Sequence, residues 1–179
     1  MKKILTLLLA ISMLSIFMVG CAPSQEIDDD VKNVNLEEIH EAVKESMGEF
    51  YGPDMELSEE ELENLIGVES SDIEEYVAEV PMMNVSIDTF IAIKAAEGKA
   101  DTIEAALEEY RTYLVEDSFQ YPMNMAKVNS AKIVRHDDYL FFLMLGQYDD
   151  REEATEEERL EFAQDEIKKI EDIINTFFE

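Results

Sequence analysis

Tyr139-Leu-Phe-Phe-Leu-Met-Leu145 is a stretch of the chain that is apolar at every position. Successive side chains of a β-strand point to opposite faces of a sheet, so this stretch would present apolar side chains on both faces. We therefore predict a strand inside a sheet whose two faces are covered, either by the chain itself or by a partner. The rest of the chain has to supply the neighbouring strands and the cover.

The run at residues 126–134 is predicted to be the strand that pairs with this stretch. Arg135-His136-Asp137-Asp138 separates the two runs and is typical of a hairpin turn, with the acidic pair at its tip. The two runs therefore predict one β-hairpin.

A second hairpin is predicted earlier in the chain, from the runs at residues 76–80 and 90–94, with a shorter run at residues 84–87 between them. Proline cannot donate a hydrogen bond to a central ladder. Because Pro81 follows the first of these runs, we expect that strand to lie at an edge of the sheet or to be bulged there.

Four helices are predicted from apolar residues spaced by three and four and from capping residues at the helix starts. They are residues 36–50 with Asn35 as N-cap, residues 59–66 between a Ser58/Glu61 capping box and Gly67, residues 101–119 opened by Asp101 and Glu104, and residues 155–177 opened by Thr155 and Glu158. The order of elements predicts an α+β fold: a two-layer sandwich in which helices pack on an antiparallel sheet made of two β-hairpins.

Tyr121 and Pro122 are predicted to form a structural corner between the third helix and the second hairpin. The residue before a proline avoids the α-helical region, so the helix has to stop here. If the Tyr121 ring is buried, its replacement by alanine would destabilise the domain.

The N-terminus has the parts of a lipoprotein signal peptide. Lys2 and Lys3 precede an apolar run at residues 4–19, and Gly20 and Cys21 follow as the small residue and the cysteine of a cleavage site. Cleavage between them would make Cys21 the N-terminus, carrying the acyl chains that hold the protein at a membrane. The alternative is an uncleaved anchor that spans the membrane once.

The chain is accordingly predicted to have three parts: a signal peptide at residues 1–20, an acylated cysteine with a flexible acidic tether at residues 21–33, and a single α+β domain at residues 34–179. The predicted location is the extracytoplasmic face of the cell membrane, which the protein would contact through its N-terminal lipid.

The charge of the chain limits its partners. It has 43 acidic residues against 14 lysines and arginines, a net charge of −29. This negative field repels phosphate backbones, so nucleic acid is excluded as a partner. A cationic ligand, a basic protein and plain solubility all remain compatible with it.

No motif for a catalytic residue, metal ion or cofactor is found. Cys21 is the only cysteine and is assigned to the lipid, so neither a disulfide nor a cysteine-based metal site is expected. His40 is expected on an exposed helix face and His136 in a hairpin turn, and neither has zinc-ligand spacing. The methionines outside the signal peptide, including Met82-Met83 and Met123-x-Met125, are interpreted as flexible core filler.

The leading functional hypothesis is a non-enzymatic binding or scaffold domain of the cell envelope that contacts another envelope protein. One alternative is a cation- or small-ligand-binding module, which the acidic charge favours. A weaker alternative is a carboxylate-dependent hydrolase of the cell wall, because paired carboxylates can hydrolyse glycosidic bonds.

Five segments of the chain resemble a known family. They are Glu75-Tyr-Val77, Phe90-Ile-Ala-Ile-Lys94, Phe119-Gln-Tyr-Pro122, Asn129-Ser-Ala-Lys-Ile-Val134 and Tyr139-Leu-Phe-Phe142. Together with the signal peptide they are similar to the lipoproteins of clostridia and related Gram-positive bacteria that carry the domain of unknown function 4358, over roughly residues 36–148. The resemblance implies a lipid-anchored surface protein and brings no catalytic residues with it.

Overall fold

The computed structural model describes residues 33–82 and 86–179. The predicted signal peptide, Gly20, Cys21 and nearly all of the predicted tether lie outside the described residues, as do the first two residues of the run at 84–87. Within the described part, no helix is long and apolar enough to cross a membrane.

The described chain is built on a five-stranded antiparallel sheet with the order β1-β2-β3-β5-β4. The strands are β1 Met55–Glu56, β2 Ile73–Val80, β3 Thr89–Ala95, β4 Lys132–His136 and β5 Tyr139–Met144. β5 lies between β3 and β4, with Phe142 opposite Ile91 on one side and Ile133 on the other. The predicted internal position of this strand is confirmed.

The predicted edge strand at residues 76–80 has a short neighbour. β2 begins at Ile73, its last two residues pair with β1, and the Leu57 N–H donates to the Ala78 carbonyl group just beyond β1. Pro81 follows directly after the strand, where its missing N–H interrupts no ladder.

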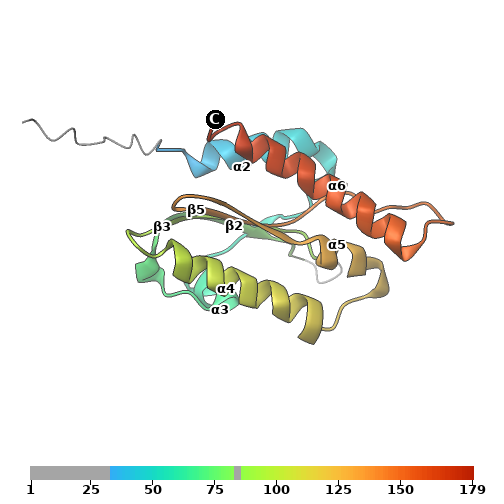
Figure 1. Ribbon diagram of the computed structural model, residues 1–179, viewed down its shortest axis with the longest axis horizontal. Helices are drawn as coiled ribbons and strands as arrows, with labels where there is room; N and C mark the ends of the chain where they lie inside the picture. The colour runs from blue at the N-terminus through green and yellow to red at the C-terminus, as the bar shows by residue number, and fades with distance from the viewer. Residues whose placement is uncertain (1–32, 83–85) are drawn as a thin grey trace, which may run out of the picture. The chain divides into compact units, whose positions relative to one another are not determined.

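Five helices cover the sheet: α2 Leu36–Met47, α3 Glu59–Ile66, α4 Ala100–Thr112, α5 Met125–Ser130 and α6 Glu156–Asn175. Figure 1 shows α2 and α6 on one face of the sheet and α3 and α4 on the other. The predicted α+β class with an antiparallel sheet is confirmed. The structure has three layers rather than the predicted two, because both faces of the central strands are apolar and each needs a cover.

The two faces of β5 enter two separate cores. Leu140 and Phe142 pack with residues of α3 and α4, such as Leu62 and Leu107. Tyr139, Phe141 and Leu143 pack on the other face with residues of α2 and α6, such as Ile39 and Ile170. All five of these β5 side chains are at most 2% exposed. The alternating strand pattern therefore divides the hydrophobic interior in two.

The capping predictions are largely confirmed. Asn35 accepts hydrogen bonds from the backbone at Glu37 and Glu38, and both predicted capping boxes are present at the starts of α3 and α6. The third helix differs, because α4 begins at Ala100 without a side-chain cap. Asp101 and Glu104 form ion pairs with Arg135 of β4 instead.

The predicted strand at residues 126–134 is wrong in its first half. Met125–Ser130 forms the short helix α5, and β4 begins only at Lys132. Val128 is fully buried and Lys127 is 2% exposed. The spacing of apolar residues in this short run fits a helix and a strand equally well. Periodicity therefore does not distinguish the two conformations.

The start of the domain is fixed to β5. The backbone N–H of Val34 donates to the Tyr139 hydroxyl at 3.1 Å, and Lys94 donates to the Asn33 side chain at 3.2 Å. The chain therefore enters the domain beside the first residue of β5.

Phe142→Ala should lower the free energy of unfolding by about 3–5 kcal/mol, because it removes a fully buried ring and leaves a cavity. The matched control is Phe119→Ala, since Phe119 is 85% exposed and should be replaceable with little change. Chemical denaturation followed by circular dichroism measures both. Equal effects of the two substitutions would contradict the assignment of β5 to the core.

Candidate functional site

A groove with a volume of about 940 Å³ opens between α5 and the segment that joins β5 to α6. One wall comes from the 3-10 turn Pro122–Asn124 and from α5, and the other from residues 148–150 and the start of α6. The groove is defined by its lining residues, which are Pro122, Met123, Met125, Ala126, Asn129, Tyr148, Asp149, Asp150, Glu156, Glu157, Arg159 and Leu160.

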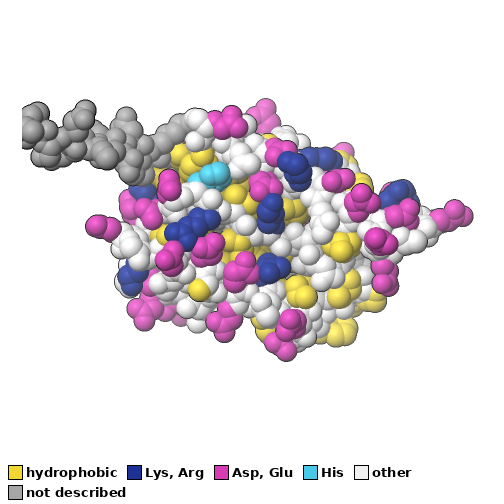
Figure 2. All heavy atoms as spheres, viewed as in Figure 1, with side chains coloured by type: hydrophobic (Ala, Val, Ile, Leu, Met, Phe, Trp, Pro, Cys, Tyr) yellow, Lys and Arg dark blue, Asp and Glu magenta, His cyan; other side chains and the backbone are white. Residues whose placement is uncertain are grey.

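Apolar side chains in and beside the groove are exposed to an unusual degree. Met123, Met125 and Tyr148 are 62%, 39% and 38% exposed. Phe119 and Tyr121 precede the groove residues and meet edge to face, with ring centroids 5.7 Å apart. Figure 2 shows hydrophobic atoms gathered over the C-terminal end of α4 and over α5. Exposed apolar side chains that gather in this way are typical of interaction sites.

Tyr121 and Pro122 lie between the end of the third helix and α5. Tyr121 has extended backbone angles, and Pro122 opens the 3-10 turn, which matches the preference of the residue before a proline. The Tyr121 side chain is half exposed. The condition for a large destabilisation by Tyr121→Ala is therefore not met, and the ring belongs to the exposed apolar surface.

A buried ion pair fixes α5 beneath the groove. Lys127 of α5 is 2% exposed and its Nζ lies 2.5 Å from Oδ1 of Asp88, the residue before β3. Burial lowers the pKa of the Lys127 ammonium, while the attraction of Asp88 opposes that shift. Separating a buried ion pair is strongly unfavourable, because it leaves a charge buried without its partner. The pair thus ties one wall of the groove to the sheet.

Tyr148 is held in the groove by two contacts. The Lys127 Nζ lies 3.8 Å from the centroid of its ring, a close cation–π contact, and its hydroxyl donates to the Asn124 side chain at 3.0 Å. Burial and the nearby Asp88 raise the pKa of Tyr148 to about 12. The ring is therefore neutral and fixed in orientation while one part of it remains open to solvent.

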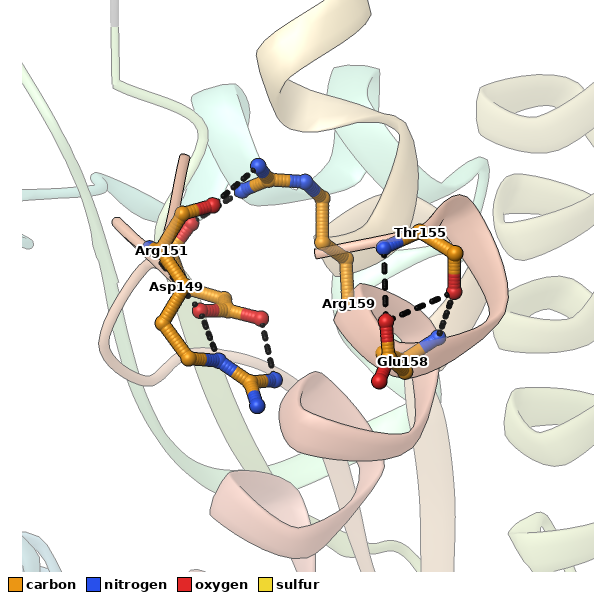
Figure 3. Close-up of polar contacts among 5 residues, drawn as sticks. All are labelled: Asp149, Arg151, Thr155, Glu158 and Arg159. Carbon is orange, nitrogen blue, oxygen red and sulfur yellow. Dashed lines mark hydrogen bonds and ion pairs between the residues drawn. The ribbon is translucent and has the colours of Figure 1, made fainter. Parts of the chain in front are cut away.

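The opposite wall is held by the arginines shown in Figure 3. Arg151 binds both carboxylate oxygens of Asp149, at 2.8 and 2.6 Å. Arg159 of α6 donates to the backbone carbonyl groups of Asp149 and Arg151. Thr155 and Glu158 cap α6 next to them, with the Thr155 N–H donating to Glu158 at 2.8 Å. These contacts hold the connection from β5 to α6 in place, although residues 145–155 form no helix or strand.

The turn after β5 is also packed closely. Gly146 has φ of +122°, and a Cβ there would lie 2.6 Å from the Cβ of Glu166 in α6. The backbone N–H of Gln147 donates to the Glu166 carboxylate at 3.1 Å. Only glycine can be accommodated this close to α6. The packing of Gly146 against α6 therefore fixes where the groove wall begins.

His40 is not on an exposed face, and that prediction is wrong. It is 4% exposed and stacks on Phe90 with centroids 5.1 Å apart. Its Nε2 lies 2.9 Å from the Tyr51 hydroxyl, which donates to Glu79 at 2.9 Å. Burial and Glu79 raise the pKa of Tyr51. These residues join α2 to β2 and line no part of the groove.

Other predicted residues also have structural positions. His136 is the last residue of β4 and stacks on Phe178 at 4.1 Å, while its Nε2 lies 2.9 Å from Asn175. Met82, Met123 and Met125 are exposed, so the interpretation as core filler is wrong for these three, whereas Met144 is buried in the core. Met83 lies outside the described residues. Among the described residues, no three His, Cys, Asp or Glu side chains are placed to hold a metal ion.

A family model with the description "Domain of unknown function (DUF4358)" matches residues 46–145, more than half of the chain. The chain belongs to this family. The match includes all five strands and α5 but ends before α6, so the matched region supplies only one wall of the groove. Comparisons with curated proteins and with solved structures found no match. The lipoprotein character that the resemblance implies stays a prediction.

Asp88→Asn should lower the free energy of unfolding by about 3–5 kcal/mol, because it leaves the Lys127 ammonium buried without its partner. The double variant Asp88→Asn with Lys127→Met should lose less than the sum of the single variants, since no charge is stranded. The control is Asp172→Asn, which breaks the exposed Lys168–Asp172 pair and should change stability far less, because water and salt screen an exposed pair. Additive single effects in the denaturation cycle would contradict the pairing.

The carboxyl group of Asp149 should titrate at about pH 2, because hydrogen bonds from Arg151 lower its pKa. An aspartate in an unfolded chain titrates near about 3.9. The depressed pKa means that the contact stabilises the wall above about pH 4 and is lost as the pH falls through about 2. NMR titration of the carboxyl carbon measures this value, and in an Arg151→Gln chain it should rise toward the unfolded value. An unchanged midpoint would show that Arg151 is not the cause.

Proposed function

We propose that the protein is a lipid-anchored, extracytoplasmic, non-enzymatic domain that binds another protein of the cell envelope in the groove. The observation that carries this proposal is the groove itself: exposed apolar side chains held in place by a buried ion pair below and an arginine-braced wall beside them. An apolar surface that is already ordered favours protein binding, because few side chains lose conformational freedom when the partner binds.

The arrangement of charged groups supports binding rather than chemistry. Lys127 and Asp88, the buried ionisable residues next to the groove, are paired with each other. Asp149 is paired with Arg151. Each of these groups therefore has a structural partner and serves the shape of the groove. The anchor is supported by Lys2, Lys3, the apolar run and Cys21 in the N-terminal sequence.

The anchor is tested by labelling cells with an alkyne-bearing fatty acid and separating membranes from the soluble fraction. The wild-type chain should carry the label and sediment with membranes. The Cys21→Ala chain should carry no label, because the acceptor thiol is missing. A labelled Cys21→Ala chain would overturn the lipoprotein assignment.

Binding through the groove is tested with a photoreactive phenylalanine analogue placed at Met123, in intact cells. The matched position is Glu60, which is exposed on α3 and lines no part of the groove. We expect a covalent adduct with an envelope protein from Met123 only, located by mass spectrometry of the linked peptides. Adducts of equal yield from both positions, or none from Met123, would contradict the proposed binding site.

A further inference from the structure

The rim of the groove carries unpaired negative charge. Asp150, Glu156 and Glu157 are exposed, line the groove, and form no side-chain ion pair with the described residues. Arg159 also lines the groove, but its guanidinium is directed at the backbone carbonyl groups of Asp149 and Arg151. The three unpaired carboxylates outnumber this one positive charge, so the rim that a bound molecule meets is net negative.

The middle of the groove is apolar and adaptable. Met123 and Met125 have flexible side chains that adjust to different shapes, while the Tyr148 ring is fixed by Lys127 and Asn124. A fixed aromatic ring among adaptable apolar side chains suits an inserted apolar side chain. The groove thus combines an apolar centre with an anionic rim.

We propose that the occupant of the groove is a cationic amphipathic segment of a partner protein, with apolar side chains on one face and lysine or arginine residues flanking them. The proposal rests on the proposed binding function and names the chemistry of its partner. Apolar residues of the segment fill the space between Met123 and Tyr148, and its cations lie against Asp150, Glu156 and Glu157.

Charge complementarity selects this occupant over others. A second copy of this chain would bring a net charge of −29 toward an anionic rim. An anionic lipid surface is repelled in the same way. A partner with clustered lysine or arginine is instead attracted before contact and oriented as it arrives.

The test uses the full chain in nanodiscs of zwitterionic phosphatidylcholine, with empty nanodiscs as the blank. The probe is a dye-labelled synthetic helix of about 16 residues with leucine on one face and lysine on the other, long enough for four turns. Two matched peptides carry glutamate in place of lysine or serine in place of leucine. Fluorescence anisotropy should show saturable binding of the lysine-leucine peptide only.

The charge contribution is tested by neutralising the rim with Asp150→Asn, Glu156→Gln and Glu157→Gln together. This chain should bind the probe about tenfold more weakly, the effect expected of three exposed charge pairs. The control chain carries Glu59→Gln, Glu60→Gln and Glu63→Gln, which remove the same charge from exposed positions of α3, away from the groove. Equal weakening by both chains would show a general field effect and overturn the proposal.

The apolar contribution is tested with Met123→Ser, at a position exposed enough for folding to be unaffected, which thermal unfolding checks. It should weaken binding severalfold. Equal binding of the glutamate-leucine peptide, or self-association of the chain that Met123→Ser abolishes, would overturn the cationic assignment while leaving the groove as a binding site. Adducts from Met123 in cells without any binding of the probe would refute this inference alone, whereas the absence of both would refute the proposed function as well.

Discussion

β5 has apolar side chains on both of its faces, and the remainder of the structure follows from the need to remove all of them from water. Phe142 points to one core and Phe141 to the other, and both are completely buried. A cover on one face alone would leave the rings of the other exposed. The chain meets this requirement with α3 and α4 on one face and α2 and α6 on the other. The groove is a consequence, because the connection from β5 to α6 has to leave the sheet and run along α5 before α6 begins.

The sequence predicts what depends on near neighbours. The N-cap at Asn35, the capping boxes at Ser58 and Thr155, and the stop at Gly67 are all present, because each involves residues within four positions of one another. The internal position of β5 is predictable for the same reason. The number of layers is not, because two apolar faces require two covers without showing whether the chain itself or a partner supplies the second one.

The groove escapes prediction because its parts are distant in sequence. Lys127 and Asp88 are 39 residues apart, and nothing near either position indicates its partner. One local hint is Lys127, which lies between Ala126 and Val128 in a run that the sequence predicts as a strand. His40 shows the same limit, since its carboxylate partner Glu79 lies on another element and its helical neighbours are charged. The sequence predicts Tyr121 and Pro122 as a corner, but their exposure depends on the position of α5, which the sequence does not show.

The entry of the chain at Asn33 has a consequence for how the domain can be reached. Asn33 and Val34 are held at Tyr139, the first residue of β5, whereas the connection that forms one wall of the groove leaves from the other end of that strand. The first and last residues of this six-residue antiparallel strand are about 17 Å apart. Asn33 and the start of the groove wall thus lie at opposite ends of β5. In the proposed function, the predicted tether and the groove would therefore meet the domain at opposite ends of the same strand.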